Sequence, residues 1–423
     1  MSSHTLFEQA LAVGRPPNVR ELFPHSRALL VSGKIIDRAL LAKGKAITMA
    51  ANGRSYFVIR GALQAAQRAN AALIIEIAKS ESTYCPVNFY NIARLVDGAC
   101  NELGITIPVA VHADHYGLKS ADEVAAAKIE IPTLFEAGIT SIAIDASHMP
   151  DDQNLLTNIE LNPFVPGWAG LETEVGEIKG EQGLSTVDDA SFLIKGLNAY
   201  DIFPDWIALN NGTAHGIEAS GEGIQVELTA EIHRHLEPYK VSGAQHGTSG
   251  NSSAKLREIA QKTRTTKANV ATALQMVSWG LEVNDAGNAA QGENDGFIKI
   301  AEEGVTSEIW EKMEALAEKN GWSGGNYKKL NLPIDNWLMA QPRRIRERMS
   351  RRVEEFVYTM LVSVFNAADT APLAMEIIAD AGSYDIGAKG TRIEDPSQWT
   401  REQIIERAKT LTTDKGPEGD FDD

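Results

Sequence analysis

The run Ile107-Pro108-Val109-Ala110-Val111 is apolar, and His112-Ala113-Asp114-His115 follows it directly. A short apolar run without polar alternation is typical of a strand that is buried on both faces, as in a parallel sheet. The imidazole and carboxylate groups that come next can bind a divalent metal ion and move a proton beside it. The stretch therefore predicts a buried strand with reactive groups at its carboxyl end.

Seven further apolar runs have the same character, and amphipathic segments such as Ala121–Ala137 separate most of them. These runs are Ala46–Ala50, Ala72–Ala78, Thr140–Ile144, Gly170–Val175, Trp206–Leu209, Val241–Ala244 and Thr266–Val270. Most of them start about 30 residues apart, which is the length of one strand–helix unit. Eight such units predict a (β/α)₈ barrel rather than a doubly wound sheet, which usually has fewer strands.

Polar residues stand at or just after the ends of the third to eighth runs. They are His112, Asp114, His115, Asp145, Glu174, His215, His246 and Asn269. Catalytic residues of such barrels lie at the carboxyl ends of the strands, so we expect these side chains to converge on one rim. The remaining candidates His148, His233 and His235 lie away from strand ends and are expected at the surface.

Composition limits the classes of function. The net charge of −17 gives no basic surplus to neutralise phosphates, which argues against a nucleic-acid partner. No apolar run approaches the roughly 20 residues of a membrane span, and the N-terminus does not resemble a secretory signal. Two cysteines are too few for a disulfide framework. We therefore expect a cytoplasmic protein with no membrane partner.

The chain divides into four expected parts. Residues 1–45 are a helical lead-in, and residues 46–290 form the catalytic barrel. Residues 291–365 are helices that pack on the barrel or at an oligomer interface. Residues 366–423 are a C-terminal extension, and its acidic end, Asp414–Asp423, is expected to be disordered.

Four residues at the strand ends match the ligand preference of a catalytic zinc ion. His115, His215, His246 and Glu174 offer three imidazoles and one carboxylate. Glycine follows two of these histidines, at Gly216 and Gly247, and lets the backbone approach a ligand closely. The segment His246–Gly250 leads into a predicted helix, whose N-terminus would suit a phosphate.

The motifs at these strand ends resemble those of the class II, zinc-dependent ketose-bisphosphate aldolases, a family that includes fructose- and tagatose-bisphosphate enzymes. The similarity runs in order over residues 45–290 and is weaker in the helix after Pro342. It is carried by His112-Ala113-Asp114-His115-Tyr116-Gly117, Ile144-Asp145-Ala146-Ser147, Glu172-Thr173-Glu174-Val175-Gly176, Gly212-Thr213-Ala214-His215-Gly216, His246-Gly247-Thr248-Ser249-Gly250 and Lys267-Ala268-Asn269-Val270-Ala271-Thr272.

The resemblance implies a (β/α)₈ barrel that catalyses reversible aldol cleavage of a phosphorylated ketose. The default substrate is fructose 1,6-bisphosphate, which yields dihydroxyacetone phosphate and glyceraldehyde 3-phosphate. Such an enzyme is a carbon–carbon lyase of carbohydrate metabolism, in glycolysis. The resemblance also implies one catalytic Zn²⁺ ion, with room for a monovalent cation near the phosphate site, and a homo-oligomer of two or more subunits.

The resemblance assigns a role to each matching position. His115, His215 and His246 would bind zinc, and Glu174 would be a further or alternate ligand. Asp114 would exchange the proton of the hydroxyl whose carbon becomes the aldehyde, and Asn269 would hydrogen-bond the enediolate. The remaining roles are phosphate or substrate binding by Gly216, Gly247, Ser249, Lys267 and Thr272, and support of the ligands by His112 and Asp145.

The chain departs from the family pattern in several places, and two of the departures bear on the loop base and on the second phosphate. In the loop after the fifth strand, Glu181 is the candidate for the base that exchanges the proton of the enediolate carbon, and Gln182 stands where an acid is common. Ala78-Lys79-Ser80-Glu81 replaces the serine and small residues that the family often has near the second phosphate.

These departures leave alternatives open. One is the same chemistry on tagatose bisphosphate or on a ketose without the second phosphate. The other is a non-catalytic barrel subunit that binds a sugar phosphate or stabilises a partner.

Overall fold

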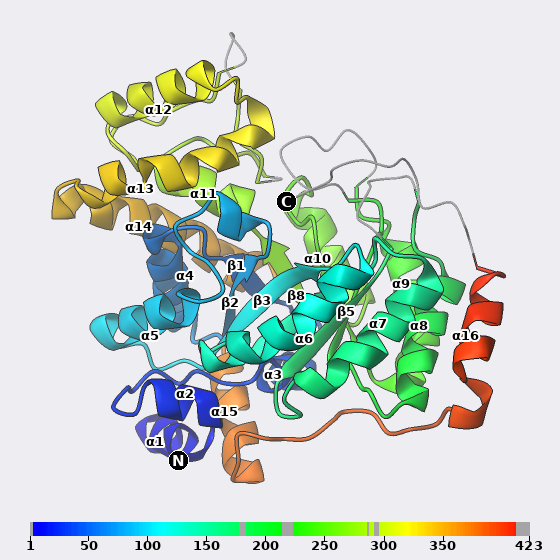
Figure 1. Ribbon diagram of the computed structural model, residues 1–423. Coiled ribbons are helices and arrows are strands. Elements are labelled where there is room, and N and C mark those ends of the chain that lie inside the picture. The colour runs from blue at the N-terminus through cyan, green and yellow to red at the C-terminus, as the bar shows by residue number, and fades with distance from the viewer. Residues whose placement is uncertain (1–2, 177–182, 214–222, 286, 292–295, 412–423) are drawn as a thin grey trace.

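The protein folds around a closed barrel of parallel strands, in which neighbours in the chain pair and β8 returns to β1 (Figure 1). The computed structural model describes residues 3–176, 183–213, 223–285, 287–291 and 296–411. The strands are β1 (Thr48–Asn52), β2 (Leu73–Ala78), β3 (Val109–Gly117), β4 (Ser141–Asp145), β5 (Gly170–Val175), β6 (Trp206–Leu209), β7 (Ser242–Gln245) and β8 (Thr265–Val270). The predicted (β/α)₈ barrel is confirmed.

Strand β3 is longer than its apolar run. We expected the strand to end at Val111, but its pairing with β2 continues, with His112 opposite Glu76 and Asp114 opposite Ala78. The expectation that the polar residues follow the strand is therefore wrong, because they belong to it. Charged side chains can extend a buried strand only where the barrel interior offers them partners, and here it does.

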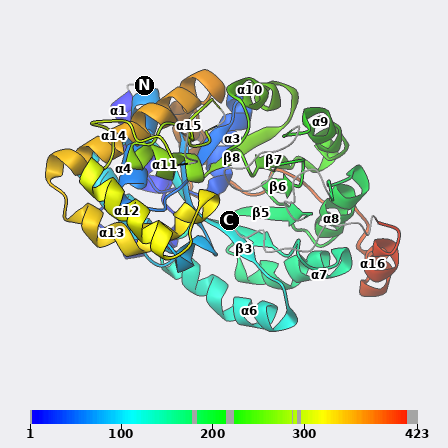
Figure 2. The same cartoon turned by 90° about the horizontal axis from the view of Figure 1, so that it is seen from above.

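Eight helices form the outer layer of the barrel in the described part of the chain, and Figure 2 shows most of them around the strands as seen from above. Several begin at a residue whose hydroxyl caps the first turn, such as Ser55, Ser120 and Ser252. The helices are α4 (Tyr56–Ala69), α5 (Ile92–Leu103), α6 (Ala121–Glu136), α7 (Asp151–Leu161), α8 (Val187–Ala199), α9 (Val226–His235), α10 (Ser253–Lys262) and α11 (Thr272–Trp279).

The N-terminal segment closes the amino end of the barrel. It contains α1 (Ser3–Val13), α2 (Pro17–Leu22) and α3 (Gly33–Lys43), and α3 contacts β2, β3, β5 and β8. A side chain at Gly33 could not be accommodated, because its Cβ would lie 2.6 Å from the hydroxyl of Ser141. The close approach of α3 to the strands makes this helix the floor of the barrel.

The C-terminal region adds a second apolar cluster beside the barrel. Its helices are α12 (Ser307–Lys319), α13 (Asn331–Met339), α14 (Arg343–Thr359), α15 (Thr370–Ala381) and α16 (Arg401–Ala408). Helix α14 packs along α4 where Gly61 faces the Ser350 carbonyl, a gap that a Cβ would close to 2.4 Å. Helices α12 and α13 stand beyond the carboxyl end of the barrel (Figure 1), around Trp279 and Trp310.

Residues 382–400 form an extended segment that runs under the barrel to α16 (Figure 1). Its anchor is Lys389, whose ammonium contacts the carboxylate of Asp37 and lies 2.9 Å from both the Asp205 carbonyl and the Ser242 hydroxyl.

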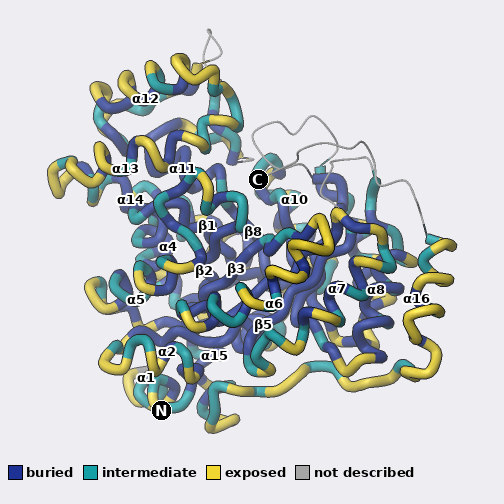
Figure 3. The backbone as a smooth tube through the Cα atoms, viewed as in Figure 1, coloured by how far each residue is buried: buried dark blue, intermediate teal, exposed yellow. Residues whose placement is uncertain are grey.

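Figure 3 shows the buried barrel against the exposed outer faces of α12 and α16. The predicted disordered end, Asp414–Asp423, lies outside the described residues.

One surface expectation is wrong. His148 and His235 are exposed, but His233 is buried and packs against Gly243 of β7. Its Nδ1 accepts a hydrogen bond from the Arg264 backbone, and burial lowers its pKa to about 4. Helix α9 turns this face to the barrel.

Among the described helices, none combines the length and the apolar character needed to cross a membrane.

Candidate active site

A bulge in β3 turns two consecutive side chains toward the same space. Residues alternate between the two faces of a regular strand, so Asp114 and His115 would ordinarily point apart. The pairing of β3 with β4 shifts between Ala113 and Tyr116, and His115 has a left-handed φ of +41°. A non-glycine residue in this region costs about 1–3 kcal/mol, a strain that is typical of functional sites. Both side chains consequently reach the centre of the rim.

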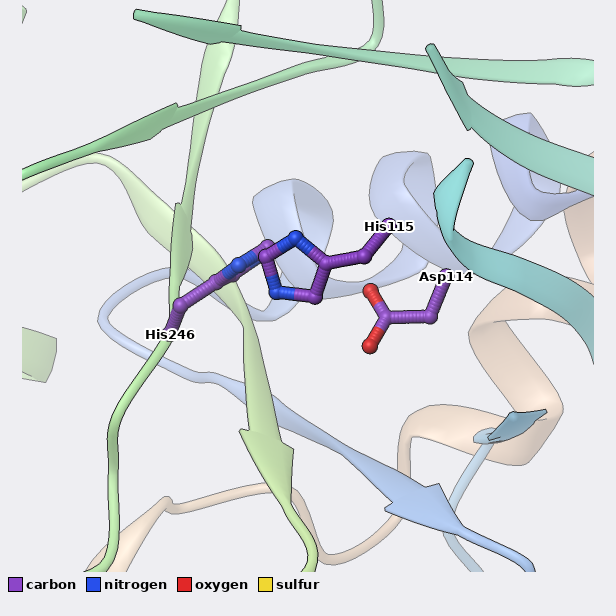
Figure 4. Close-up of side chains that lie close together, drawn as sticks. All are labelled: Asp114, His115 and His246. Carbon is purple, nitrogen blue, oxygen red and sulfur yellow. The ribbon is translucent and has the colours of Figure 1, made fainter. Parts of the chain in front are cut away.

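His115 meets two other predicted ligands there, Glu174 and His246, and Figure 4 shows it beside His246. Its Nδ1 lies 3.0 Å from Oε1 of Glu174, and its ring centroid lies 4.3 Å from that of His246. Nδ1 of His246 is buried, has no hydrogen-bond partner among the described residues, and lies 3.8 Å from Oε2 of Glu174. Donor atoms of Asp114, His115 and His246 lie within 4.8 Å of one another, as do those of Glu172, Glu174 and His246.

Two carboxylates orient the imidazoles. Oε1 of Glu172 lies 2.7 Å from Nε2 of His246, and Oδ2 of Asp145 lies 3.4 Å from Nδ1 of His115. Asp145 is itself fixed, because its Oδ1 accepts hydrogen bonds from the backbone and the hydroxyl of Ser147. Carboxylates in this position set the tautomer and the orientation of imidazoles that bind metal.

The ionisation of these groups suits a cation. Burial lowers the pKa of His246, which is then neutral as a metal ligand must be. Burial and the charge of Asp145 raise the pKa of Glu174 to about 8. Burial opposes ionisation of Glu172, but Lys267 and His246 outweigh it and hold the pKa of that carboxyl below its usual range. The acidic residues of the site thus carry more negative charge than its basic residues balance.

His112 lies deeper in the barrel than the predicted ligands. Its Nδ1 is 2.8 Å from the hydroxyl of Ser141, and its Nε2 is 3.6 Å from Oε2 of Glu172. Burial lowers the pKa of His112 to about 3, and Lys267 adds to the effect, so the ring is neutral. Its side chain contacts the carboxylate that supports His246, which fits a supporting role.

Asp114 and Asn269 are brought into direct contact. The amide nitrogen of Asn269 donates a 2.9 Å hydrogen bond to Oδ1 of Asp114. The amide oxygen of Asn269 is buried without a hydrogen-bond partner among the described residues. Although burial opposes it, His115 and Lys267 lower the pKa of Asp114, which therefore carries a charge.

Lys267 is fully buried inside the barrel. Its ammonium nitrogen lies 2.9 Å from Oε2 of Glu172, 3.1 Å from Oε2 of Glu76 and 3.6 Å from Oδ1 of Asp114. These carboxylates come from strands β5, β2 and β3. The structure thus places Lys267 among carboxylates below the rim.

Three of the predicted phosphate-binding residues lie at the ends of β7 and β8. Gly247 has a left-handed φ of +58°, and Ser249 is partly exposed in the same turn. Thr272 is the first residue of α11, and its hydroxyl accepts a 3.4 Å hydrogen bond from Arg54. The ends of the seventh and eighth strands are a frequent phosphate site in such barrels.

Three predicted site residues cannot be placed. Glu181, His215 and Gly216 lie outside the described residues. Their roles stay predictions.

The sequence reasoning missed Glu172, Glu76 and the buried pair of Arg54 with Glu81. Glu172 could have been found, since it stands two residues before Glu174 and must share its face of β5. Glu81 accepts hydrogen bonds from the Ala78 backbone and the Asn52 amide, and it contacts the guanidinium of Arg54. No local signal identifies these partners, because the barrel brings them together.

Comparison with known proteins agrees with this geometry. Residues 34–321 match the family model described as fructose-bisphosphate aldolase class-II. A fructose-bisphosphate aldolase of Staphylococcus aureus (strain Mu50) is 34% identical over 121 residues, which are 28% of this chain and 39% of the relative. The chain thus spans about two fifths of the length of that relative. A fructose-bisphosphate aldolase of Streptococcus pneumoniae serotype 4 is 28% identical over 225 residues, 51% of this chain and 69% of the relative.

Solved structures share the fold. The YdjI aldolase from Escherichia coli K12 has a TM-score of 0.54 at 16% identity, and the match covers 81% of this chain and 99% of that one. Fructose-bisphosphate aldolase from Campylobacter jejuni has a TM-score of 0.53 at 17% identity, with coverage of 81% and 97%. The family model spans well over half of the chain, and the chain belongs to the class II fructose-bisphosphate aldolase family.

Proposed function

We propose that the protein catalyses reversible aldol cleavage of a phosphorylated ketose, with fructose 1,6-bisphosphate as the default substrate. The observation that carries the proposal is the convergence of His115, Glu174 and His246 beside the charged carboxylate of Asp114. Such a site offers metal ligands and a base at one point on the rim. Family membership supports the same chemistry.

The residues present fit a zinc ion. A buried Nδ1 of His246 without a described partner, an adjacent carboxylate and a second imidazole match the nitrogen and oxygen ligands of catalytic zinc. His115, His246 and Glu174 would hold the ion, with His215 as the further ligand that family resemblance predicts. When bound, zinc supplies Lewis-acid stabilisation of the negative charge that develops on the ketone oxygen.

The chain's own residues would handle the protons and the substrate. Asp114 would accept the proton of the hydroxyl whose carbon becomes the aldehyde, and would return it in condensation. Asn269 is placed beside Asp114 and would donate to the enediolate, whose carbon Glu181 would reprotonate. The phosphate of the dihydroxyacetone half would be held by Gly216, Gly247, Ser249 and Thr272, with a monovalent cation nearby.

The aldehyde half of the substrate is less constrained. The carboxylate of Glu81 accepts the Ala78 backbone N–H at the end of β2 and pairs with Arg54. The Ala78 N–H and the Arg54 guanidinium are thus already bound to Glu81. Without Glu81 they would be available to an anion such as a phosphate. This arrangement favours a ketose with no phosphate on the aldehyde half as the second candidate substrate.

We further propose that the protein is a cytoplasmic homo-oligomer. Leu332, Trp337 and Met339 of α13 are exposed apolar side chains, which supports a contact between copies. Sedimentation equilibrium would test this, and a monomer at micromolar concentration would contradict it.

A cleavage assay on a panel of ketose phosphates tests the proposed reaction. The panel holds fructose 1,6-bisphosphate, tagatose 1,6-bisphosphate and fructose 1-phosphate, each assayed with metal-free and with zinc-reconstituted protein. We expect cleavage only with zinc and on at least one of them. Absence of cleavage with one zinc ion bound per chain would instead favour a non-catalytic sugar-phosphate-binding subunit.

A further inference from the structure

The proposed reaction does not use the buried charge of Lys267. Lys267 is fully buried in the barrel interior, and the charges of Glu172, Glu76 and Asp114 raise its pKa despite burial. An ammonium group is removed from water only where carboxylates replace its hydration. The side chain is thus a fixed cation directly below the candidate site.

Lys267 is held from two sides of the barrel. Glu172 of β5 lies 2.9 Å from its ammonium nitrogen, and Glu76 of β2 lies 3.1 Å from it. Both oxygens of Glu76 are buried, and Oε2 is the oxygen that faces the ammonium. Two carboxylates on different strands restrict the ammonium to one position, although the lysine stem is flexible in itself.

The third carboxylate near the ammonium is the proposed base. Oδ1 of Asp114 lies 3.6 Å from Nζ of Lys267, and the same oxygen accepts the hydrogen bond from Asn269. Attraction from Lys267 and donation from Asn269 therefore act on a single oxygen. The other oxygen, Oδ2, carries neither contact, and the carboxylate stands beside the rings of His115 and His246 (Figure 4).

We propose that Lys267 is a positioning residue that acts through Asp114. Its ammonium anchors Oδ1, so that Oδ2 faces the substrate hydroxyl and takes its proton. This inference rests on the proposed aldol chemistry, and it gives Lys267 a role other than the phosphate contact that the sequence motif suggests. Glu76 contributes to the same positioning, because it holds the ammonium of Lys267 from the side opposite Glu172.

A double-mutant cycle tests the inference. Lys267→Met removes the charge and keeps the shape, and Asp114→Asn removes the base. We expect Lys267→Met to lower kcat about 100-fold in the native background and less than about 3-fold in the Asp114→Asn background, because both act through one group. KM should change less than about 3-fold, and zinc should remain at one ion per chain.

Each other outcome has a defined meaning. An equal loss in both backgrounds would overturn the proposal, because Lys267 would then act independently of Asp114. Loss of zinc in Lys267→Met would also overturn it, and would place the effect on Glu172 and His246. Lack of cleavage by the zinc-loaded native protein would instead contradict the proposed function.

Two further variants keep the test decisive. Lys389→Met, which removes a lysine with a buried side chain at the floor of the barrel, should leave kcat unchanged. If Lys267→Met does not fold, Glu76→Gln replaces it in the cycle, with an expected loss of about 10-fold in the native background alone. A loss of the same size in the Asp114→Asn background would overturn the proposal.

Discussion

Two buried lysines show how differently the interior and the floor of the barrel use charge. Lys389 lies at the floor and contacts one carboxylate, that of Asp37, together with neutral oxygens of Asp205 and Ser242. Lys267 lies below the rim and contacts three carboxylates. The floor is balanced, because the ammonium groups of Lys389 and Lys34 lie near the carboxylates of Asp37 and Asp205. The interior holds an excess of negative charge.

This difference separates structure from function. A balanced buried pair keeps two segments together, here α3 and the extended segment 382–400. A cluster with excess buried negative charge destabilises the fold. It is retained where other cations compensate the charge. Burial and the charge of Asp114 raise the pKa of Glu76, and a metal ion at the rim would balance negative charge that Lys267 leaves.

Removing the metal should have the largest effect, a loss of cleavage activity. The excess negative charge of the interior then lacks the cation that would balance it. We expect treatment with a chelator to lower cleavage at least about 1,000-fold, and zinc to restore it. The measurement is the retro-aldol rate before and after dialysis, and after one equivalent of zinc. Full activity at a zinc content below about a tenth of an ion per chain would contradict the account, because the metal would then not be needed.

Removing the floor lysine should destabilise the protein and leave its chemistry intact. Lys389→Met leaves Asp37 buried with the hydrogen bond from the Thr266 hydroxyl but without its ion-pair partner, which costs about 3 kcal/mol of unfolding free energy. Urea unfolding followed by circular dichroism measures this loss, with kcat as the second readout. Lys409→Met, which removes an exposed pair with Glu406, is the matched control and should change neither. A lower kcat in Lys389→Met would contradict the account, because the floor lysine would then affect catalysis as well as stability.

Removing the support of His246 should have a smaller effect on metal binding. Glu172→Gln keeps the shape of the side chain but weakens its hold on Nε2 of His246. We expect zinc affinity to fall about 10- to 100-fold, measured by competition with a chromogenic chelator. Unchanged affinity would show that Glu172 serves Lys267 alone.

The smallest expected effect is the dependence of zinc binding on pH. Burial and Asp145 raise the pKa of Glu174 to about 8, so below that pH a proton competes with the metal. Zinc affinity should rise about tenfold per pH unit between pH 7 and 8, and then level off. Calorimetry in two buffers of different ionisation enthalpy would count the released proton. Glu174→Gln should remove the pH dependence.

The fold could be predicted because its strands are continuous apolar runs. The predicted runs Gly170–Val175 and Trp206–Leu209 coincide with β5 and β6. The C-terminal half of β3 was missed because its polar residues are stabilised by partners on β4, β5 and β8. The same long-range partnership explains the burial of His233, whose helix could not be oriented from its own sequence.

The candidate site was predictable in its members and not in its connections. Asp114, His115, Glu174 and His246 converge as their strand-end positions require. Spacing along the chain could not indicate that Lys267 turns to carboxylates of three strands, nor that Glu172 supports His246. Both facts depend on the barrel's closure and on the bulge at His115.

The most direct test compares native protein with Asp114→Asn, both loaded with zinc, in two assays on the same samples. One assay follows ketose cleavage, and the other follows deuterium exchange into dihydroxyacetone phosphate. We expect Asp114→Asn to bind one zinc ion, to lose at least about 1,000-fold in cleavage, and to keep the exchange, since Asp114 serves only the hydroxyl proton. Loss of zinc, or cleavage at the native rate, would contradict the role of Asp114 as the base of this site.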